Sequence, residues 1–400
     1  MAVSPTTVEG DGARLSAAEQ DEIVAVARRL AADRGAPRAL DVANTHDYPE
    51  DLFEALRDGG YFGLYPGPEW GGIGADLLTV CRVVEELAKV SNTLASIVIG
   101  QLQGTLPILI TGTDELRARY VPDLVAGRIK PAMALTEPDA GSDVAGIKTS
   151  ARPETRPEGE GYLLNGSKCF ITMANLADVI TVYAKRSPGR STSAIQGFVI
   201  PRGTPGLHVG RVEEKMGSTA LPTCEVQLDD VWVPASHALG DVGTGFRSAM
   251  KVLEHVRPMI AARSVGLAQG ALDDAVAHLR QREAFGQPLA TLQGLQFKIA
   301  DMAMGIEAAR GLVEKACRAL DADDPLANRY CAMAKCFATD TAMHVTTEAV
   351  QLFGGYGYMR DYPVEARFRE AKVAQIVDGT NEIQRVVIAR SVLGPEARPR

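Results

Sequence analysis

The spacing of apolar residues changes twice along this chain of 400 residues, and this pattern limits the possible folds more than any other feature. Helical spacing prevails at first, short apolar runs separated by Gly, Pro and Ser follow, and helical spacing then returns. Helical runs on both sides of a run of strands indicate separate parts, each with its own core. We predict a mainly α chain with a small β domain: an N-terminal α-helical domain (1–130), a middle antiparallel β domain (131–240) and a C-terminal four-helix bundle (241–400).

The N-terminal part shows the signals of several helices. Ser16 and Glu19 have the spacing of a capping box, and apolar residues follow them at helical intervals. Further helices are predicted over 49–57, 76–89, 93–110 and from Asp114 onward. The segment 93–110 is the most apolar in the chain, but two glutamines and Pro107 interrupt it, so we interpret it as a buried helix and not as a membrane span.

A β-hairpin is predicted in the middle part, before the chain returns to helices. Asn165-Gly166 stands between the apolar runs 162–164 and 169–171, and this dipeptide favours a tight hairpin turn. Short strands are expected next over 179–184, 197–200 and 224–233. Helical spacing then extends over 246–280, 292–320, 326–353 and 381–392, which is typical of an antiparallel bundle with short connections.

Composition argues against several classes of function. Forty-two Lys and Arg stand against fifty Asp and Glu, a net charge of -8, and no basic block is present that could follow a nucleic-acid backbone. The N-terminal segment lacks the pattern of a secretory signal, so we expect a solvated arm and a cytoplasmic protein with no membrane partner. The six cysteines and six histidines show no metal-ligand spacing, and we expect reduced core cysteines and no metal.

One C-terminal segment joins several turn signals in a fixed order. It reads QLFGGYGYMRDYPVEARFREAKVAQIVDGTNEIQR (351–385): an apolar helix that ends in glycines, a proline elbow, a charged helix and then Asp378-Gly379-Thr380. Each signal alone is ordinary helix capping. The whole segment resembles the C-terminal signature of the acyl-CoA dehydrogenase family, in which it contacts FAD and supplies the catalytic carboxylate.

Three more motifs carry the same resemblance. AMALTEPDAGSDVAGIKTSA (132–151) is similar to the family's AxTEPxAGSD signature, KCFIT (168–172) to its KxWIT pattern, and REAFG (282–286) to its RxxFG. The resemblance covers about residues 15–395, and the predicted order of helical, β and helical parts is also the family's order. It implies the acyl-CoA dehydrogenase fold and FAD as the cofactor.

The resemblance assigns roles to individual residues. Asp378 takes the place of the base that removes the substrate α-proton. The residues expected to bind FAD are Leu135, Thr136, Gly141, Ser142, Phe170, Thr172, Arg282, Phe285, Gln293, Gln351, Gly354, Gly355, Thr380 and Glu382. Those expected to contact the substrate are Ser142, Arg257 and Gly379. Because the RxxFG arginine of the family reaches the FAD diphosphate of a neighbouring subunit, the resemblance also implies a homo-oligomer and, by the family's example, a tetramer.

Two departures from the family pattern affect the cofactor and substrate contacts. Phe170 stands where the family usually has tryptophan, which keeps a flat apolar wall but removes the indole N–H donor. The loop 216–223 lacks the Arg and Ser of the usual GxRxSxT pattern, so family contacts to the substrate's carrier do not transfer to it.

The third departure concerns the base. Asp378 stands where most of the family has glutamate, while some relatives carry the base on the first bundle helix, directly before an arginine. In this chain Val256 precedes Arg257, and Glu254 lies two positions from the required place and on another side of the helix. We therefore interpret Glu254 as a structural or surface carboxylate.

The function implied by the resemblance is FAD-dependent α,β-dehydrogenation of an acyl thioester linked to CoA or to an acyl-carrier protein. The base removes the α-proton and the β-hydride passes to flavin N5, with electron-transferring flavoprotein or oxygen as the acceptor. A flavin oxidase or monooxygenase on the same fold, resembling the nitroalkane oxidases with their aspartate base, is the alternative. A binding protein without turnover is a third possibility, which no feature of the sequence favours.

Overall fold

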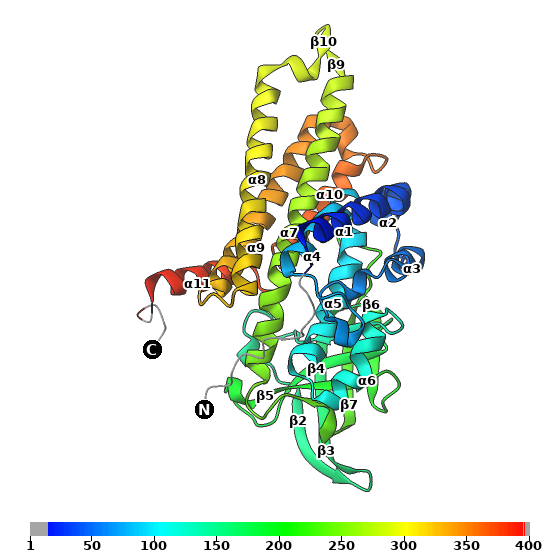
Figure 1. Cartoon of the computed structure of the whole chain (residues 1–400), viewed down its shortest axis with the longest axis vertical. Helices are drawn as coiled ribbons and strands as arrows, with labels where there is room; N and C mark the ends of the chain where they lie inside the picture. The colour runs from blue at the N-terminus through cyan, green and yellow to red at the C-terminus, as the bar shows by residue number, and fades with distance from the viewer. Residues whose placement is uncertain (1–14, 395, 397–400) are drawn as a thin grey trace.

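The computed structural model describes residues 15–394 and 396 of the chain. Figure 1 shows an elongated molecule in which a twisted sheet occupies one end, long helices run away from it, and shorter helices cover one side. The order of helical, β and helical parts predicted from the sequence is confirmed. The solvated arm predicted for the start of the chain lies outside the described residues.

The N-terminal helices begin at side-chain caps. Ser16 Oγ accepts from the backbone N–H of Glu19 at 3.3 Å, and the Ser16 N–H donates to Glu19 Oε2 at 2.8 Å, which confirms the capping box. Asp76, Ser91 and Thr113 cap later helices through their side chains. The helices are α1 Ala17–Leu30, α2 Ala39–Asn44, α3 Glu50–Asp58, α4 Leu77–Val90, α5 Asn92–Thr111 and α6 Asp114–Val125.

Helix α5 is long and apolar enough to cross a membrane by length and composition alone. It runs through the interior of the fold instead, where 78% of its apolar window is buried. The side chain of Gln101 is buried too, and its Nε2 donates to the carbonyl oxygens of Leu124 and Ile129, both at 2.9 Å. The prediction of a buried helix is confirmed, and both hydrogens of this core amide are hydrogen-bonded.

The middle part is one eight-stranded sheet. Its strands are β1 Pro131–Ala134, β2 Ser150–Arg156, β3 Gly159–Thr172, β4 Val179–Lys185, β5 Ile195–Pro201, β6 Leu207–Val212, β7 Thr223–Pro234 and β8 Ala238–Leu239. The order along the sheet is β6-β7-β3-β2-β4-β5-β8, and β1 pairs with β4. Neighbouring strands are antiparallel, except that β1 and a single residue pair of β2 run parallel to β4. The sheet is therefore mainly antiparallel.

The prediction of a hairpin at Asn165-Gly166 is wrong, because β3 continues through this dipeptide without a turn. Gly166 lies at a register shift between β3 and β7, where its φ is 152° and a Cβ would lie 2.5 Å from Thr149 Oγ1. The Asn165 side chain exchanges two hydrogen bonds with Asp230 on β7, at 2.9 and 3.0 Å. The dipeptide therefore forms a bulge, and the chain turns between β2 and β3 instead.

The C-terminal part is built on one long helix, which starts on the sheet and reaches the far end of the molecule (Figure 1). Its elements are α7 Gly245–Gln281, β9 Glu283–Ala284, β10 Gln287–Pro288, α8 Gln293–Asp321, α9 Ala327–Phe353, α10 Pro363–Ala374 and α11 Asn381–Leu393. α7 packs against α9 and against α4 of the N-terminal part, and α8 packs on α9. α10 lies against α9 and α7, and α11 also packs against α9 while its end points away from the bundle (Figure 1). The fourth helix predicted over 381–392 is therefore α11, which contacts α9, and α10 is a further helix that packs on both α7 and α9.

The bulge at Gly166 gives a testable prediction. Gly166→Ala is expected to lower the free energy of unfolding by about 1–3 kcal/mol more than Gly159→Ala, because its new methyl group would overlap Thr149. Gly159 is the matched control, since its φ of 127° is also positive but nothing lies within 4 Å of its Cβ position. Urea unfolding measures the difference, and equal losses in the two variants would contradict a bulge that depends on close approach.

Candidate active site

The residues expected to bind FAD and substrate form two separate groups. The first group lies around α5, the loop after β1, the end of β3 and the turn before α11. Its members are Leu135, Thr136, Gly141, Ser142, Phe170, Thr172, Arg257, Asp378, Gly379, Thr380 and Glu382. The second group lies at the far end of the bundle, near β9 and β10 (Figure 1). Its members are Arg282, Phe285, Gln293, Gln351, Gly354 and Gly355.

Helix α5 contacts several of the segments that carry the first group. A Cβ at Gly104 would lie only 2.6 Å from the ring of Pro131, so the helix approaches β1 closely at this point. Gly100, one turn earlier, faces the sulfur of Met173, which directly follows β3. Gly104 therefore lets α5 approach the start of β1 closely, and Gly100 lies beside the Met173 side chain at the end of β3.

A buried ion pair fixes the loop after β1. Lys168 on β3 is fully buried, Glu137 in the loop is 5% exposed, and Nζ lies 2.8 Å from Oε1. Lys168 Nζ also donates to the carbonyl oxygen of Leu135 at 3.0 Å. The backbone N–H of Cys169 donates to the carbonyl oxygen of Thr136 at 3.0 Å. The pair thus joins the two segments, loop and strand, that carry the expected flavin contacts.

Burial and pairing act against each other in this ion pair. Burial lowers the pKa of the Lys168 ammonium to about 8, although the carboxylate beside it favours the charged form. Burial alone would raise the pKa of Glu137, but Lys168 and hydrogen bonds from Thr149 and Lys148 bring it below its usual value. The backbone N–H of Thr149, for example, donates to Oε1 at 2.9 Å. The pair is therefore charged at neutral pH.

Phe170 is an exposed aromatic side chain in an uncommon backbone conformation. Its φ is 59°, and 68% of its surface is exposed. Such a conformation is unfavourable for a bulky residue and occurs often at binding sites. Nothing lies within 4 Å of the Cβ position of Gly141, and Thr172 and Ser142 are exposed. A flat apolar face, an open glycine and two free hydroxyls fit the ring of FAD.

Asp378 lies in the turn between α10 and α11. Its φ is 54° and that of Gly379 is 89°, so the turn holds two successive left-handed residues, one of which has a side chain. Gln103 Nε2 on α5 donates to Asp378 Oδ1 at 2.9 Å. The described residues supply no hydrogen-bond partner for the backbone N–H of Asp378. The turn therefore presents a carboxylate and a backbone donor on the same residue.

Two buried side chains hold this turn by its backbone. Lys335 Nζ on α9 donates to the carbonyl oxygen of Gly379 at 3.0 Å and to Asn381 Oδ1 at 2.9 Å. Gln384 Nε2 donates to the same carbonyl oxygen at 2.8 Å. A Cβ at Gly379 would lie 2.7 Å from Gln384 Nε2, which is the end of a side chain, so the positive φ of 89° is the main reason for glycine at this position.

Three buried cations influence the Asp378 carboxylate. Arg257 and Arg263 on α7 are 5% and 7% exposed, and Lys335 is fully buried. Burial raises the pKa of Asp378 above that of an ordinary aspartate, while these cations and the Gln103 amide favour its charged form and oppose the rise. Among the described residues, Arg257 Nε and Arg263 Nη2 find no hydrogen-bond partner. The carboxylate is thus an ionisable group of raised proton affinity in a positive environment.

Glu254, the other acidic residue considered as a base, lies on α7 and is half-buried. Burial raises its pKa, and Arg257 and Lys251 oppose that rise. Arg257 itself donates from Nη1 to Asn328 Oδ1 at 2.9 Å. None of the described hydrogen bonds or ion pairs joins Glu254 to the Asp378 turn, and its role as a structural or surface carboxylate stays a prediction.

The second group lies too far along the bundle to join the first within one chain. The guanidinium of Arg282, at the end of α7, lies 5.8 Å from the ring centroid of Tyr356. Phe285 is 91% exposed and has a φ of 55°, as unusual as that of Phe170. At 1.5 Å per helical residue, Arg282 lies roughly 37 Å along α7 from Arg257. Arg282 cannot reach across this distance to the first group of its own chain.

The loop that departs from the family pattern makes contacts inside the fold. Thr219 Oγ1 donates to the carbonyl oxygen of Thr45, just after α2, at 2.6 Å. Arg369 Nη1 on α10 donates to the carbonyl oxygen of Met216 at 3.1 Å. This loop therefore connects α2 with the helix that precedes the Asp378 turn.

Sequence reasoning missed several residues around Asp378. In the sequence Gln103 only interrupts an apolar helix, and no motif includes Lys335 or Arg263. Each of these residues is a polar residue inside an apolar helical stretch. Such a residue predicts a hydrogen-bond partner within the fold, but the sequence does not identify that partner. Glu137 and Lys168 were part of the recognised motifs, but their mutual contact follows only from the fold.

Comparisons with known proteins cover nearly the whole chain. Family models for the N-terminal, middle and C-terminal domains of acyl-CoA dehydrogenase match residues 17–128, 132–231 and 243–393. The cyclohex-1-ene-1-carbonyl-CoA dehydrogenase of Syntrophus aciditrophicus (strain SB) is 43% identical over 378 residues, 94% of this chain and 90% of that protein.

Solved structures give the same result. Butyryl-CoA dehydrogenase from Megasphaera elsdenii has a TM-score of 0.91 and 39% identity, covering 96% of this chain and 100% of that one. A chain from a structure described as the electron transferring flavoprotein of Acidaminococcus fermentans has a TM-score of 0.90 and 38% identity, covering 95% and 99%.

The buried ion pair gives the second prediction. Lys168→Met is expected to lower the free energy of unfolding by about 3–5 kcal/mol and to weaken FAD binding, because it leaves the Glu137 carboxylate buried without its partner. Lys148→Met is the control, since its ion pair with Asp139 is exposed and should matter little. Denaturant unfolding and flavin absorbance measure both effects. A Lys168→Met protein as stable as the Lys148→Met protein would contradict this role for the pair.

Proposed function

The chain belongs to the acyl-CoA dehydrogenase family and is an FAD-dependent oxidoreductase of acyl-CoA substrates, and we propose that Asp378 is the base of its reaction. The observation that carries this proposal is the turn at Asp378, where a carboxylate of raised proton affinity adjoins a backbone N–H that has no partner within residues 15–394. The two enzymes compared above are named as dehydrogenases, so the oxidase or monooxygenase alternative is not favoured.

FAD, when bound, supplies flavin N5 as the acceptor of the β-hydride. We infer that the segments joined by Lys168 and Glu137 hold the flavin ring. The residues proposed to contact the ring are Leu135, Thr136, Gly141, Ser142, Phe170 and Thr172. Thr380 caps α11 through its hydroxyl, and we place it with exposed Glu382 at the edge of the same site.

The proposed base acts through the oxygen that the protein leaves unoccupied. Gln103 donates to Oδ1 of Asp378, and we propose that Oδ2, which accepts no hydrogen bond from the described residues, takes the α-proton. The thioester carbonyl accepts a hydrogen bond from the Asp378 N–H, which stabilises negative charge as the proton leaves. Arg257 adds positive charge nearby, and Gly379 and Ser142 are proposed to contact the thioester. Because a base acts only when ionised, kcat/KM should fall as the pH drops through a pKa above that of an ordinary aspartate.

We infer that the substrate is a CoA thioester with a branch or ring at its α-carbon. Aspartate is shorter than glutamate by one methylene, roughly 1.5 Å, which leaves room beside the α-carbon. The relative from Syntrophus aciditrophicus is named for a ring-bearing substrate. Anaerobic flavin bleaching with cyclohexanecarbonyl-CoA and butyryl-CoA tests this inference, and faster bleaching by butyryl-CoA would contradict it.

We propose electron-transferring flavoprotein as the acceptor in a cytoplasmic enzyme. A structure described as such a flavoprotein contains a chain of similar fold, which supports this choice over oxygen. Reoxidation of the reduced enzyme by purified electron-transferring flavoprotein, compared with air, separates the two acceptors.

We also infer a homo-oligomer in which each FAD is held by two chains. The separation of Arg282 from the Asp378 turn along α7 supports this arrangement, because the second group then serves a neighbour's cofactor. The residues proposed to act in this way are Arg282, Phe285, Gln293, Gln351, Gly354 and Gly355. Phe285, whose side chain is exposed and whose backbone has a positive φ, gains a contact in such an assembly.

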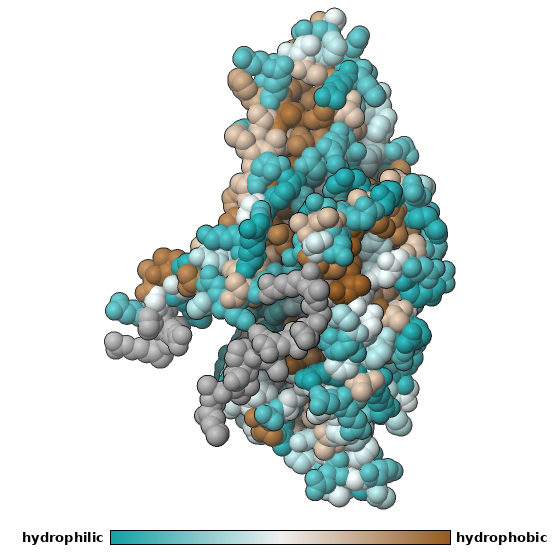
Figure 2. Space-filling model, viewed as in Figure 1, coloured by the Kyte–Doolittle hydropathy of each residue, from teal (hydrophilic) through white to brown (hydrophobic). Residues whose placement is uncertain are grey.

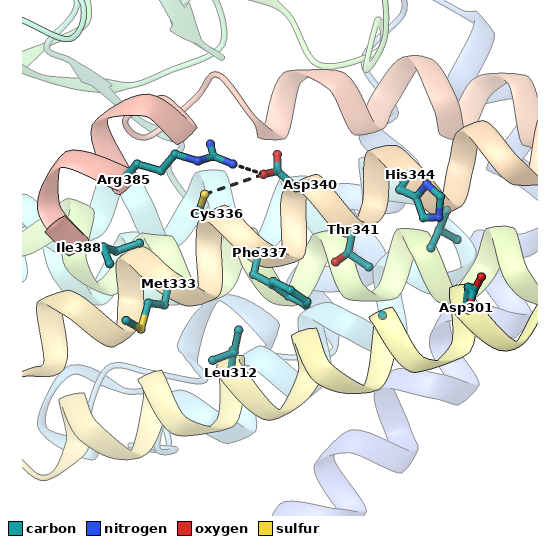
Figure 3. Close-up of a pocket in the computed structure, with 12 residues that line it drawn as sticks. Asp301, Leu312, Met333, Cys336, Phe337, Asp340, Thr341, His344, Arg385 and Ile388 are labelled. Carbon is teal, nitrogen blue, oxygen red and sulfur yellow. Dashed lines mark hydrogen bonds and ion pairs between the residues drawn. The ribbon is translucent and has the colours of Figure 1, made fainter. Parts of the chain in front are cut away.

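An apolar groove on the bundle supports further contacts between copies, as in a tetramer. It has a volume of about 550 Å³ and lies between α8, α9 and α11, with Leu312, Phe337 and Ile388 among its lining residues (Figure 3). The end of α11 exposes further apolar side chains, including Val392 and Leu393 (Figure 2). Apolar surface gathered on a projecting helix is typical of an interface between copies.

The proposed base gives the third prediction. Asp378→Asn is expected to lower kcat by roughly 10²- to 10⁴-fold with FAD still bound, because the amide keeps the shape of the side chain but cannot accept the proton. Glu254→Gln is the matched control and should retain activity. Anaerobic stopped-flow reduction with an acyl-CoA measures both variants. Full activity in Asp378→Asn, with loss in Glu254→Gln, would place the base on α7.

The length of the base gives the fourth prediction. Asp378→Glu is expected to lose about tenfold or more in rate, because the longer side chain displaces the carboxylate from Gln103 by about 1.5 Å within a site arranged around aspartate. The loss should be larger for a ring-bearing thioester than for butyryl-CoA. A gain with both substrates would show that the native aspartate is limited by its reach.

The shared cofactor site gives the fifth prediction. Arg282→Ala removes the proposed pair with the FAD diphosphate, so FAD should bind about 10- to 100-fold more weakly while the fold survives. Arg280→Ala, an exposed arginine two residues earlier on α7, is the control. Flavin retention during gel filtration with light scattering measures FAD content and mass together. A monomer that keeps its FAD would contradict the two-chain site.

A further inference from the structure

A short base must be oriented accurately, because misplacement by about 1 Å lowers a rate by roughly 10²-fold. We propose that Gln103 is the positioning residue for Asp378: its side-chain amide orients the carboxylate and stabilises the charged form. This inference rests on the proposed role of Asp378 as the base and goes beyond it, because it assigns a function to a residue of α5 that lies outside all the recognised motifs.

Helix α5 holds Gln103 in a fixed position. The next residue, Gly104, meets Pro131 so closely that a Cβ would lie 2.6 Å from its ring, and Gly100 faces Met173 one turn earlier. Gln103 reaches from this packed helix to Asp378, 275 residues later in the chain, with Nε2 at 2.9 Å from Oδ1. The amide thus fixes the position of the Asp378 carboxylate relative to α5, the helix that also contacts Met173 at the end of β3.

Gln103 is the one side chain in the described part of the chain that donates a hydrogen bond to the Asp378 carboxylate. The charged groups that face this carboxylate are Arg257 and Arg263 from α7 and Lys335 from α9. Their hydrogen bonds go elsewhere: Arg257 to Asn328, Arg263 to Ser96, and Lys335 to Gly379 and Asn381. Buried Glu370 on α10 acts on Arg263 and not on the base directly.

The cations and the amide therefore have different effects. A cation at a distance favours the charged form of the carboxylate without fixing its direction. The Gln103 N–H does both, because a hydrogen bond constrains direction as well as charge. With Oδ1 occupied, Oδ2 is the remaining oxygen for the α-proton.

The test compares Gln103→Leu and Gln103→Glu with the native enzyme. Loss of the donor makes the charged carboxylate less stable, so the acid limb of kcat/KM should move to higher pH by about one unit in Gln103→Leu. Gln103→Glu places a second carboxyl beside the first and should move the limb further. On the alkaline plateau kcat should fall about tenfold in Gln103→Leu, with little change in KM.

A second readout follows proton removal without turnover. In 3-thiabutyryl-CoA sulfur replaces the β-carbon, so the base can remove the α-proton but no β-hydride can leave. The pH at which bound thioester ionises, seen as long-wavelength absorbance, should rise in the same order as the acid limb. Gln101→Leu is the matched control: it removes two core hydrogen bonds on the same helix and should lower Tm without moving either pH profile.

Unchanged pH profiles in both Gln103 variants, or an equal shift in Gln101→Leu, would overturn the role of Gln103. This outcome is distinct from failure of the proposed base. If Asp378→Asn stays active, Asp378 is not the base at all. If Asp378→Asn is inactive while Gln103→Leu has the native profile, the base is correct and Gln103 does not position it.

Discussion

The close approach of α5 to the start of β1 is the constraint on which the site depends. Gly104 allows this contact because any side chain there would overlap Pro131. The same helix then faces the end of β3 through Gly100 and the Asp378 turn through Gln103. Helix α5, which resembles a membrane span in composition, thus positions β1, the end of β3 and the Asp378 carboxylate relative to one another.

Two buried polar networks fix the chemistry around this helix. Lys168 and Glu137 join the loop to the strand, and Lys335 with Gln384 holds the turn that carries the base. Buried charges are weak contributors to stability, because the free energy of desolvation offsets most of their attraction. Their effect here is positional: each fixes a backbone segment whose carbonyl oxygen it binds. Lys335, together with Arg257 and Arg263, also opposes the effect of burial on the pKa of Asp378.

The sequence predicted the elements well and some of their contacts poorly. Periodicity located the long helices, and side-chain caps such as Ser16 and Asp76 marked the starts of shorter ones, because both signals are local in the sequence. The hairpin turn predicted at Asn165-Gly166 was wrong, because these residues form a bulge that depends on Thr149 and on the neighbouring strand β7. The motifs located the candidate site, but no local pattern connects Gln103 with a carboxylate 275 residues away.

In the proposed assembly, Asp378 of one chain and Arg282 of another serve the same FAD. Co-expression of Asp378→Asn chains with Arg282→Ala chains tests it, with activity measured without added FAD. In a mixed pair one site carries both defects and the other carries neither, so random mixing should restore about a quarter of the native sites. Activity no higher than that of the two parent variants would contradict a site shared between chains.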